Sequence, residues 1–286
     1  MDFSFLLIQL LNGVQYGLLL FLIASGLSLV FGIMGIINLA HGAMYMIGAY
    51  LAYSLTAQLG SLWLAIALGI PIMLGVGVVI ERFLVGTLYH RDHLYQVLLT
   101  FGLILILNEL QSLLWGNDPH SVPIPELLSG SITLTETMSY PVYRLAVSAV
   151  CLVLAVVMYL IIQKTRLGMT IRAGASNREM VESLGININT LFTIIFAAGV
   201  ALAGFAGMIA APLSSVYPGM GDNILIIAFV VVVIGGIGSI KGAFLGALLI
   251  GLVSTFGPVL VPTLASVMVY LVMALVLLWK PRGLFA

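Results

Sequence analysis

The chain alternates between long apolar runs and short polar breaks. No Asp, Glu, Lys or Arg occurs in residues 3–80, and the stretches 183–221, 223–240 and 242–279 also lack them. A helix that crosses the hydrocarbon core of a bilayer needs about 20 consecutive apolar residues. The charge-free stretches therefore predict several membrane-crossing helices, joined by short uncharged turns.

The breaks between the runs predict nine helical segments. They are residues 5–32, 36–57, 61–81, 95–115, 141–163, 189–211, 224–240, 243–259 and 262–279. The seventh and eighth segments are short for a full crossing, so tilted or re-entrant arrangements stay open for both. The predicted fold is an all-α polytopic transmembrane bundle of about eight to ten spans. Residues 1–286 are expected to form one transmembrane domain.

Composition excludes a water-soluble domain. Hydrophobic residues make up 62% of the chain and charged residues only 7%, whereas a soluble domain carries about 25% charged residues. The formal net charge is zero, so nothing indicates a nucleic-acid partner. The first residues lack the basic region of a cleaved signal peptide, and Cys151 lies inside an apolar run. We expect the first segment to be a permanent helix and Cys151 to be a buried core residue.

Lysine and arginine in short loops predict the orientation, because such loops usually stay in the cytoplasm. Basic residues follow the third and fifth segments, separate the seventh from the eighth, and close the sequence: Arg82, Arg91, Lys164, Arg166, Arg172, Arg178, Lys241, Lys280 and Arg282. The outer loop, about residues 116–140, carries Asp118, Glu126 and Glu136 and no base. We expect this loop outside and the C-terminus in the cytoplasm; nine spans then place the N-terminus outside.

Two glycine-containing stretches repeat at an offset of 200 positions. The first has Gly35, Ile37, Gly42 and Ala43, and the second has Gly235, Ile237, Gly242 and Ala243. Transporters often contain duplicated halves with the substrate path between them. Because these residue types are abundant in the chain, chance similarity stays open as the alternative.

The most polar cytoplasmic stretch is the loop at about residues 164–188. Its residues 169–184 predict an amphipathic helix, with Gly185 placed to end it. One face is apolar, with Ile171, Ala175, Met180, Val181 and Leu184, and the other is charged, with Arg172, Arg178, Glu179 and Glu182. This pattern is typical of a docking helix for a soluble partner, and a solvated linker is the alternative.

The same loop carries a family resemblance. Residues 179–185, Glu-Met-Val-Glu-Ser-Leu-Gly, keep the Glu-to-Gly spacing of the EAA loop of ABC importer permeases, with Met180 and Val181 in place of two alanines. Further motifs resemble those of branched-chain amino acid ABC permeases in the family's order: residues 26–50, 172–178, 184–187, 235–247 and 280–285. The chain is identified as a member of that family.

The resemblance implies a permease subunit of an ATP-driven importer in a bacterial inner membrane. Its solutes would be leucine, isoleucine, valine or related small molecules, with amides, urea and aromatic acids as alternatives. It implies as partners two cytoplasmic ATP-binding subunits that hold ATP and magnesium, a homologous second permease, and a periplasmic binding protein. It also implies that residues Arg172, Arg178, Glu179, Glu182 and Gly185 transmit the ATPase movement, and that this chain binds no cofactor.

Three polar residues within apolar segments are candidates for the translocation path: Asn38, His41 and Glu109. Polar groups at membrane depth usually face a bundle interior or a cavity. Asn38 and His41 would alternatively lie in a cytoplasmic turn, where they bond each other's backbone. Glu109 would alternatively reach the headgroup region or pair with Arg144. Asp222, in an outer turn, is a candidate contact for the binding protein or an ordinary loop charge.

Motifs for independent chemistry are absent from the sequence. It contains no Gly-Lys-Ser or Gly-Lys-Thr phosphate loop, no His-Glu-x-x-His pair and no Gly-x-Ser-x-Gly elbow. We therefore expect no enzymatic activity and no metal site in this chain. A secondary ion-coupled transporter is a weaker alternative, because such proteins bury ionisable residues in their spans. The spacing of Gly242 and Gly246 predicts close helix packing.

Overall fold

The described part of the chain folds into eleven α-helices, three 3-10 turns and one two-stranded hairpin. The computed structural model describes residues 3–89, 91–135 and 138–285, without the side chains of Phe3, Leu134, Thr135, Met138, Arg178 and Glu179. The helices are α1 (Phe3–Met34), α2 (His41–Leu59), α3 (Leu62–Phe83), α4 (His93–Trp115), α5 (Val142–Lys164), α6 (Arg166–Ser176), α7 (Arg178–Ser183), α8 (Ile188–Ala210), α9 (Met220–Gly235), α10 (Ile240–Leu260) and α11 (Met268–Trp279). The remaining elements are η1 (Val85–Leu88), η2 (Glu126–Leu128), η3 (Pro262–Leu264), β1 (Ser131–Thr135) and β2 (Met138–Pro141).

Each of the nine predicted segments contains a helix, and the all-α polytopic fold is confirmed. Within the residues that the structure describes, six helices are long and apolar enough to cross a membrane: α1, α3, α4, α5, α8 and α10. The 16-residue α9 and the 12-residue α11 reach only about 24 and 18 Å at 1.5 Å per residue. The last segment begins at Met268 rather than near residue 262, because Pro262–Leu264 forms a separate turn.

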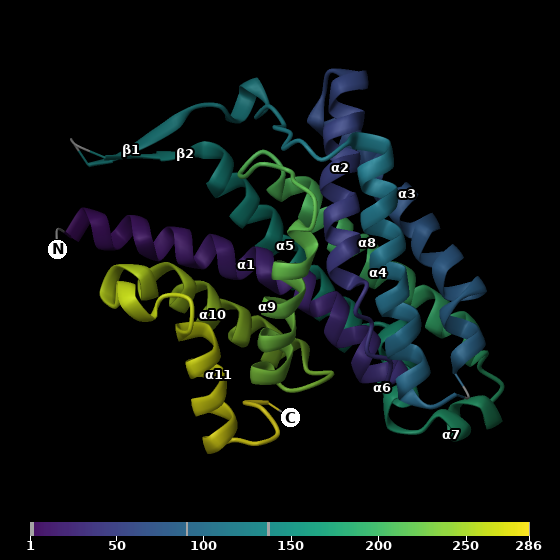
Figure 1. The fold of residues 1–286 in the computed structure, drawn as a ribbon. Coiled ribbons are helices and arrows are strands. Elements are labelled where there is room, and N and C mark those ends of the chain that lie inside the picture. Colours follow the sequence, from purple (N-terminus) through teal and green to yellow (C-terminus); the bar gives the residue numbers. More distant parts are fainter. Residues whose placement is uncertain (1–2, 90, 136–137, 286) are drawn as a thin grey trace.

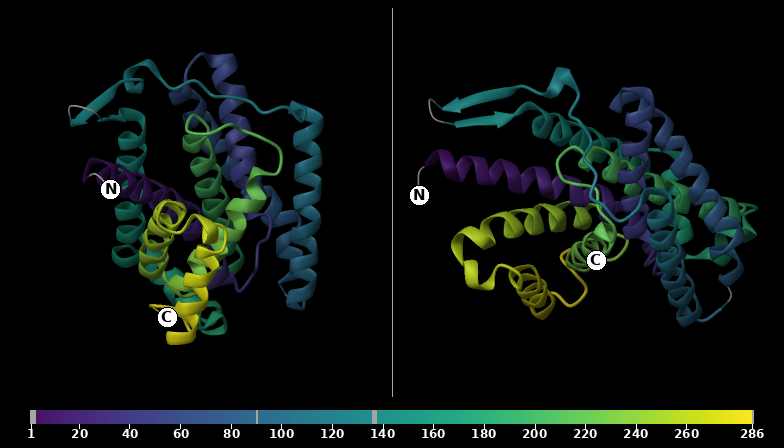
Figure 2. Two further views of the ribbon diagram at one scale, coloured as in Figure 1. Left: turned by 60° about the vertical axis from the view of Figure 1, so that its left-hand side comes forward. Right: turned by 45° about the horizontal axis from the view of Figure 1, so that its top comes forward.

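Helix α1 runs through the centre of the molecule (Figures 1 and 2). Its 32 residues span about 48 Å, well over the bilayer's hydrocarbon thickness of about 30 Å. Figure 1 shows the helix inclined to α2. Helices α8, α9 and α10 pack along it, and α2 turns back from its C-terminal end. The middle of α1 is therefore buried on all sides.

The outer helices expose apolar side chains instead of polar ones. Large residues on α3, α4 and α5 are about half exposed or more, among them Leu64, Val79, Leu98, Leu113 and Val153. Such surfaces suit lipid, which explains the low content of charged residues. Cys151 on α5 is a buried free thiol, as predicted.

Glycines allow the inner helices to touch backbone to backbone. A Cβ atom added at Gly48 of α2 would collide with Gly204 of α8, and one added at Gly42 would collide with Gly221 of α9. On α1, a Cβ at Gly26 would lie 2.9 Å from the carbonyl oxygen of Gly199. Small residues drive close packing of helices in lipid, where the hydrophobic effect between helices is absent.

The two repeated stretches occupy equivalent helix–link–helix junctions. Gly35 follows α1 with φ +68° and leads through a non-helical link to α2, whereas α9 ends at Gly235 and continues through Gly236 and Gly238, both with positive φ, to α10. The last turns of α1 meet the second link where Gly32 packs against Gly238. Gly242 and Gly246 of α10 pack closely on α9, as predicted. An internal duplication stays a prediction, to which these junctions add a structural parallel.

Residues near the C-terminus complete the end of α9. The backbone N–H groups of Leu284 and Phe285 donate to the carbonyl oxygens of Ile234 and Gly235, at 2.8 and 3.1 Å. The last carbonyls of a helix have no partner within the helix and are costly to bury unpaired. This segment therefore supplies the hydrogen bonds that the short helix lacks at that end.

The loop at 116–140 contains the hairpin β1–β2, which the apolar pattern did not predict. The strands are antiparallel, with Ile132 opposite Tyr140, and the chain passes directly from Pro141 into α5. The hairpin lies at the opposite end of the molecule from α6 and α7 (Figure 1). Glu136, one of the acidic residues of this loop, falls outside the described residues.

Replacing Gly48 by alanine tests the backbone contacts. The added methyl group must push α2 away from Gly204, and overpacking of this kind costs about 1–3 kcal/mol. We expect Gly48→Ala to lower the thermal unfolding midpoint of the purified chain in detergent. Gly75→Ala on α3 is the matched control, because no atom lies within 4 Å of a Cβ added there; equal midpoints for the two variants would contradict the packing argument.

Candidate functional site

The junction between α1 and α2 is a non-helical link buried at the centre of the bundle. Asn38 and His41 have no exposed surface, although the backbone from Gly35 to Ala40 lies outside any helix. Non-helical backbone at membrane depth is tolerated only where protein or a water-filled cavity surrounds it. Thr100 of α4 reaches the link with a hydroxyl that lies 3.4 Å from the carbonyl oxygen of Ile37.

Each polar side chain of this junction uses only part of its hydrogen-bonding capacity. His41 Nε2 lies 2.9 Å from the carbonyl oxygen of Ile23, and Asn38 Oδ1 accepts from the backbone N–H of Ala40 at 3.1 Å. Within the described part of the chain, Asn38 Nδ2 and His41 Nδ1 have no partner. Buried polar atoms are rarely left in this state, so the junction has one donor and one ring nitrogen ready for water or a solute.

Glu109 does not join this junction. Its side chain is exposed on α4, whereas Asn38 and His41 are fully buried. Arg144, its suggested partner, donates a hydrogen bond from Nη1 to Asn12 Oδ1 at 2.8 Å. The structure therefore brings together two of the three predicted path residues and leaves Glu109 apart.

A polar pocket surrounds Arg144 close to the hairpin. It encloses about 300 Å³ between α1, α2, α5, α10 and the loop after α8, and its polar lining comprises Asn12, Gln15, Tyr16, Tyr45, Arg144, Ser214 and Thr255. The Tyr140 hydroxyl also donates to Asn12, at 3.2 Å. The pKa of Tyr140 lies above its ordinary value because the side chain is partly buried, and the adjacent Arg144 guanidinium reduces this shift. The pocket thus combines one cation with neutral donors and acceptors, which suits an anionic group.

Sequence reasoning missed this pocket, although a signal was present. Arg144 is the only Lys or Arg of the sequence outside the basic loops and the C-terminal segment. A cation that departs from the general distribution of charge marks a functional position in a membrane protein. Spacing along the chain gave no hint that Asn12, 132 positions away, would meet it.

Glu81 at the end of α3 is a second missed residue. Its carboxylate is 2% exposed and accepts hydrogen bonds from the hydroxyls of Thr193 on α8, at 2.6 Å, and of Tyr89. The carboxylate thereby connects α3, the turn after it and α8. This connection lies at the end of the molecule where α6 and α7 join α8.

The predicted amphipathic helix is two helices. Asn177 adopts an extended conformation between α6 and α7, and its Oδ1 accepts from the backbone N–H of Met180 at 3.0 Å, which caps α7. Gly185 ends α7 with φ +82°, as predicted. The break at Asn177 turns α7 away from α6, so the two short helices do not share one continuous apolar face.

The faces of these helices also differ from the prediction. Ile171 and Val181 are buried, but Met180 and Leu184 are 60% and 75% exposed. Arg172 turns back and donates to the carbonyl oxygen of Ile162 at the end of α5. Glu182 is exposed on α7; the side chains of Arg178 and Glu179 lie outside the described part of the structure. Two large apolar side chains, those of Met180 and Leu184, are thus exposed at this end of the bundle.

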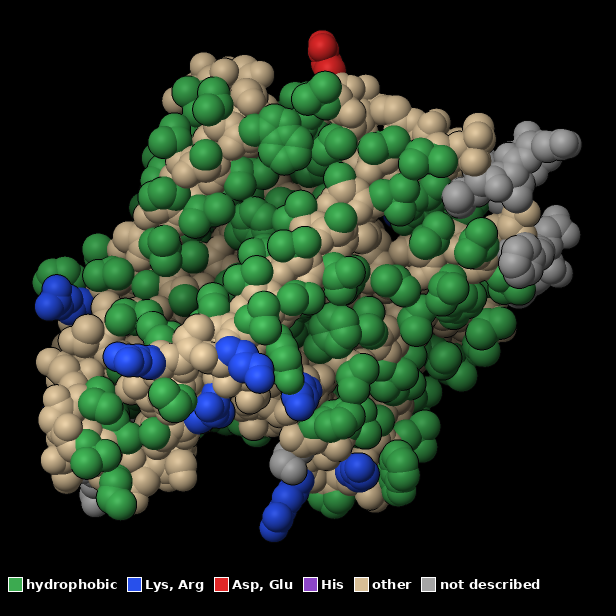
Figure 3. Space-filling view, turned by 180° about the vertical axis from the view of Figure 1, so that it is seen from behind, with side chains coloured by type: hydrophobic (Ala, Val, Ile, Leu, Met, Phe, Trp, Pro, Cys, Tyr) green, Lys and Arg blue, Asp and Glu red, His purple; other side chains and the backbone are tan. Residues whose placement is uncertain are grey.

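Charge is distributed unequally over the molecule. Figure 3 shows Lys and Arg side chains gathered across the lower part of one view, below a broad apolar area. We call the end that carries α6, α7, the α3–α4 loop and the start of α10 the basic face, and the opposite end the hairpin face. Among the described residues no group of three or more His, Cys, Asp or Glu side chains is placed to hold a metal ion.

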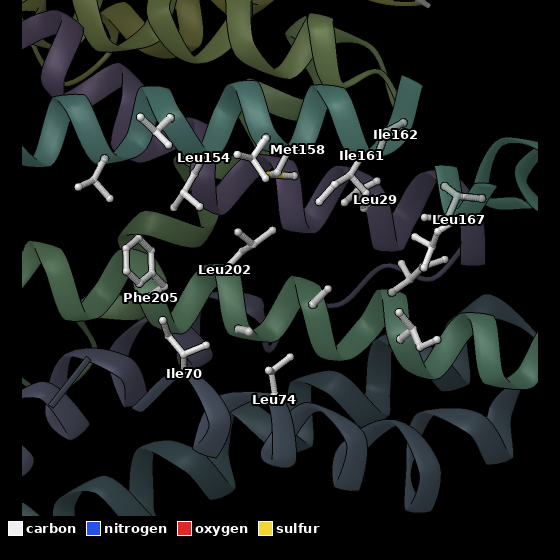
Figure 4. Close-up of a pocket in the computed structure, with 18 of the residues that line it drawn as sticks. Leu29, Ile70, Leu74, Leu154, Met158, Ile161, Ile162, Leu167, Leu202 and Phe205 are labelled. Atoms are coloured by element: carbon white, nitrogen blue, oxygen red, sulfur yellow. The ribbon is translucent and has the colours of Figure 1, made fainter. Parts of the chain in front are cut away.

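A large apolar cleft opens between α3, α5 and α8. It encloses about 630 Å³, and Leu154, Met158, Ile161, Leu202, Phe205, Ile70 and Leu74 converge on it from these three helices (Figure 4). No charged residue is among the described side chains that line it. The cleft suits hydrocarbon and offers nothing to recognise a polar solute.

Comparisons with known proteins place this helical bundle in a family. Residues 9–277 match the family described as "Branched-chain amino acid transport system / permease component". BraD of Pseudomonas aeruginosa, named a high-affinity branched-chain amino acid transport system permease protein, is 34% identical over 96% of this chain and 94% of its own length. LivH of Escherichia coli, with the same description, is 31% identical over 99% and 96%.

LivM of Escherichia coli, also named a permease protein of such a system, is 28% identical over 92% of this chain and 67% of its own length. No solved structure matches the chain. The family match spans the α1–α2 junction, the Arg144 pocket, and α6 and α7, because it extends from residue 9 to residue 277.

Removing the Glu81 carboxylate tests the connection between α3 and α8. Glu81→Ala removes the carboxylate that accepts from the hydroxyls of Tyr89 and Thr193, although the Thr193 hydroxyl can still donate to the carbonyl oxygen of Asn189 at 2.9 Å. Hydrogen bonds to a charged group contribute about 1.5–3 kcal/mol each. We expect a clearly lower thermal unfolding midpoint in detergent, with Glu81→Gln intermediate. Glu109→Ala is the control at an exposed position, where the free energy of unfolding should change by less than about 0.5 kcal/mol. A similar midpoint for Glu81→Ala and Glu109→Ala would refute the role.

Proposed function

Because the chain belongs to the permease-component family of branched-chain amino acid transport systems, we propose that it imports leucine, isoleucine, valine or closely related small solutes. Two ATP-binding subunits supply the energy and hold ATP and magnesium, a periplasmic binding protein delivers the solute, and a second homologous permease completes the path. This chain binds no cofactor of its own. The complex resides in a bacterial inner membrane, with the basic face and the C-terminus in the cytoplasm.

One observation carries the proposal: exposed apolar side chains lie at one end of the bundle, and a polar pocket beside the hairpin lies at the other. Met180 and Leu184 project from the basic face, where cytoplasmic ATPase subunits would bind. The Arg144 pocket and the hairpin lie at the other end, where a binding protein would release its solute. Asp222, exposed in the first turn of α9, is a further contact for that protein.

Movement of α7 reaches the bundle through α8. Asn187 caps α8 by accepting from the backbone N–H of Thr190 at 3.1 Å, so only residues 184–187 separate the two helices. Helix α8 packs against α1, α2 and α3. Residues Arg172, Arg178, Glu179, Glu182 and Gly185 form the coupling segment, and a shift of α7 displaces α8 along its glycine contacts with α2.

The proposed path starts in the Arg144 pocket and passes the α1–α2 junction. A zwitterionic amino acid presents a carboxylate that Arg144 can bind in a bidentate manner. Asn38 and His41 offer a donor and a ring nitrogen deeper in the bundle. Glu109 plays a lesser part, because its exposed position on α4 allows contact only with lipid, a partner subunit or the aqueous edge.

Uptake by the reconstituted importer tests the function. Proteoliposomes are prepared with both permeases, with the ATPases facing the lumen and with the binding protein outside. They should accumulate labelled leucine only when ATP is enclosed in the lumen. Unlabelled isoleucine and valine should compete, whereas urea and small amides should not. Accumulation driven by an ion gradient without ATP would identify a secondary transporter, and competition by urea or amides alone would reassign the solute.

Gly185→Ala tests the coupling segment. A non-glycine residue at φ +82° costs about 1–2 kcal/mol, which should alter the end of α7, weaken its connection to α8 and raise the ATP consumed per solute transported. Gly60→Ala is the matched control, because Gly60 has φ +68° and equally open surroundings but lies between α2 and α3. Both complexes should assemble normally; an unchanged ratio for Gly185→Ala would remove α7 from the coupling route.

A further inference from the structure

A pocket with two cations opens on the basic face, where α5, α6 and α10 meet. It encloses about 400 Å³, and we call it the head pocket; its lining includes Arg172, Lys241, Ser239, Gln163, Tyr159 and Phe285. The Lys241 ammonium lies 5.6 Å from the centre of the Tyr159 ring. Ser239 caps the 21-residue α10, so the positive end of that helix dipole is also directed to this region.

No negative charge compensates these cations within the pocket. None of the described residues that line it is Asp or Glu. Arg172 is bonded through Nη1 to a backbone carbonyl, which holds the guanidinium against α5 and leaves further N–H donors of its planar group for an anion. The head pocket therefore presents cationic N–H donors with no carboxylate among its described lining residues.

An apolar cleft continues from the head pocket along the lipid-facing surface. It encloses about 360 Å³ between α1, α5 and α10, and its own lining consists of Phe21, Leu152, Ala155, Val156, Phe244 and Leu245. We call it the tail cleft. Four residues line both cavities: Tyr159, Ile240, Lys241 and Phe285. Because they share these walls, the two cavities form one amphipathic groove.

We propose that this groove binds an anionic phospholipid, with the phosphate between Arg172 and Lys241 and one acyl chain in the tail cleft. Basic pockets between helices at the cytoplasmic surface recognise acidic lipid headgroups, and the adjoining cleft distinguishes a lipid from a soluble anion. The larger cleft between α3, α5 and α8 lacks a cation among its described lining residues and does not share this chemistry. A bound lipid bridges α6, which carries Arg172, to α10, which carries Lys241.

Lipid binding to the purified full-length chain tests the headgroup site. Native mass spectrometry with added phosphatidylglycerol should show specific binding, with phosphatidylcholine bound at least tenfold more weakly. Each basic residue near a membrane surface contributes about 1 kcal/mol, so Arg172→Gln and Lys241→Gln should each weaken phosphatidylglycerol binding about fivefold. Arg91→Gln, an equal loss of charge in the α3–α4 loop, should leave the affinity unchanged. Equal binding of both lipids, or equal loss with Arg91→Gln, would overturn the proposal.

A pair of valines on α5 tests the tail cleft. Val156 lines it, whereas the similarly exposed Val153 lines the other apolar cleft. Val156→Trp should fill the cleft and weaken phosphatidylglycerol binding at least fivefold, and Val153→Trp should not, with both variants monodisperse and equal in thermal stability. Inorganic phosphate and glycerol phosphate should fail to compete at millimolar concentration. Effective competition together with an unaffected Val156→Trp would show a soluble-anion site instead.

Discussion

Contact between helix backbones is the constraint on which the rest of this structure depends. Gly48 and Gly204 allow α2 and α8 to touch, Gly42 and Gly221 do the same for α2 and α9, and Gly26 allows α1 to approach α8. In lipid these contacts gain van der Waals energy and exclude no water, so only close fit makes them favourable. A side chain as small as a methyl group at such a crossing pushes the helices apart and weakens the van der Waals contacts that hold them together.

The same contacts explain how polar atoms survive at the centre of the bundle. Asn38 sits on backbone that is not helical, His41 begins α2 directly after it, and neighbouring helices leave neither side chain any exposed surface. The ring of His41 lies against Gly26, where an added Cβ would come within 3.1 Å of it. Tight packing therefore creates the protected space in which a broken helix and its partly bonded side chains are tolerated.

The sequence allowed the positions of the long helices to be predicted because burial in lipid needs a continuous run of apolar residues. The end of α7 at Gly185 was also predictable, since a helix stop has a local signature. The break at Asn177 was not, because the apolar pattern continues across it and only the capping bond to Met180 identifies it. The partners of Arg144 and Glu81 come from distant helices, and without an alignment the sequence contains no information on such contacts.

The pairing of Leu284 and Phe285 with the end of α9 has a consequence for biogenesis. The acceptor at Ile234 and the donor at Leu284 are 50 positions apart (284 − 234), so the residues that close α9 are synthesised only after α10 and α11. Until α10 and α11 have been inserted and the chain has folded back, the exposed carbonyls of α9 need water, lipid headgroups or the insertion machinery as temporary partners. Helix α9 is thus made before α10 and α11, but its last two carbonyl groups gain their hydrogen-bond partners after those helices have been made.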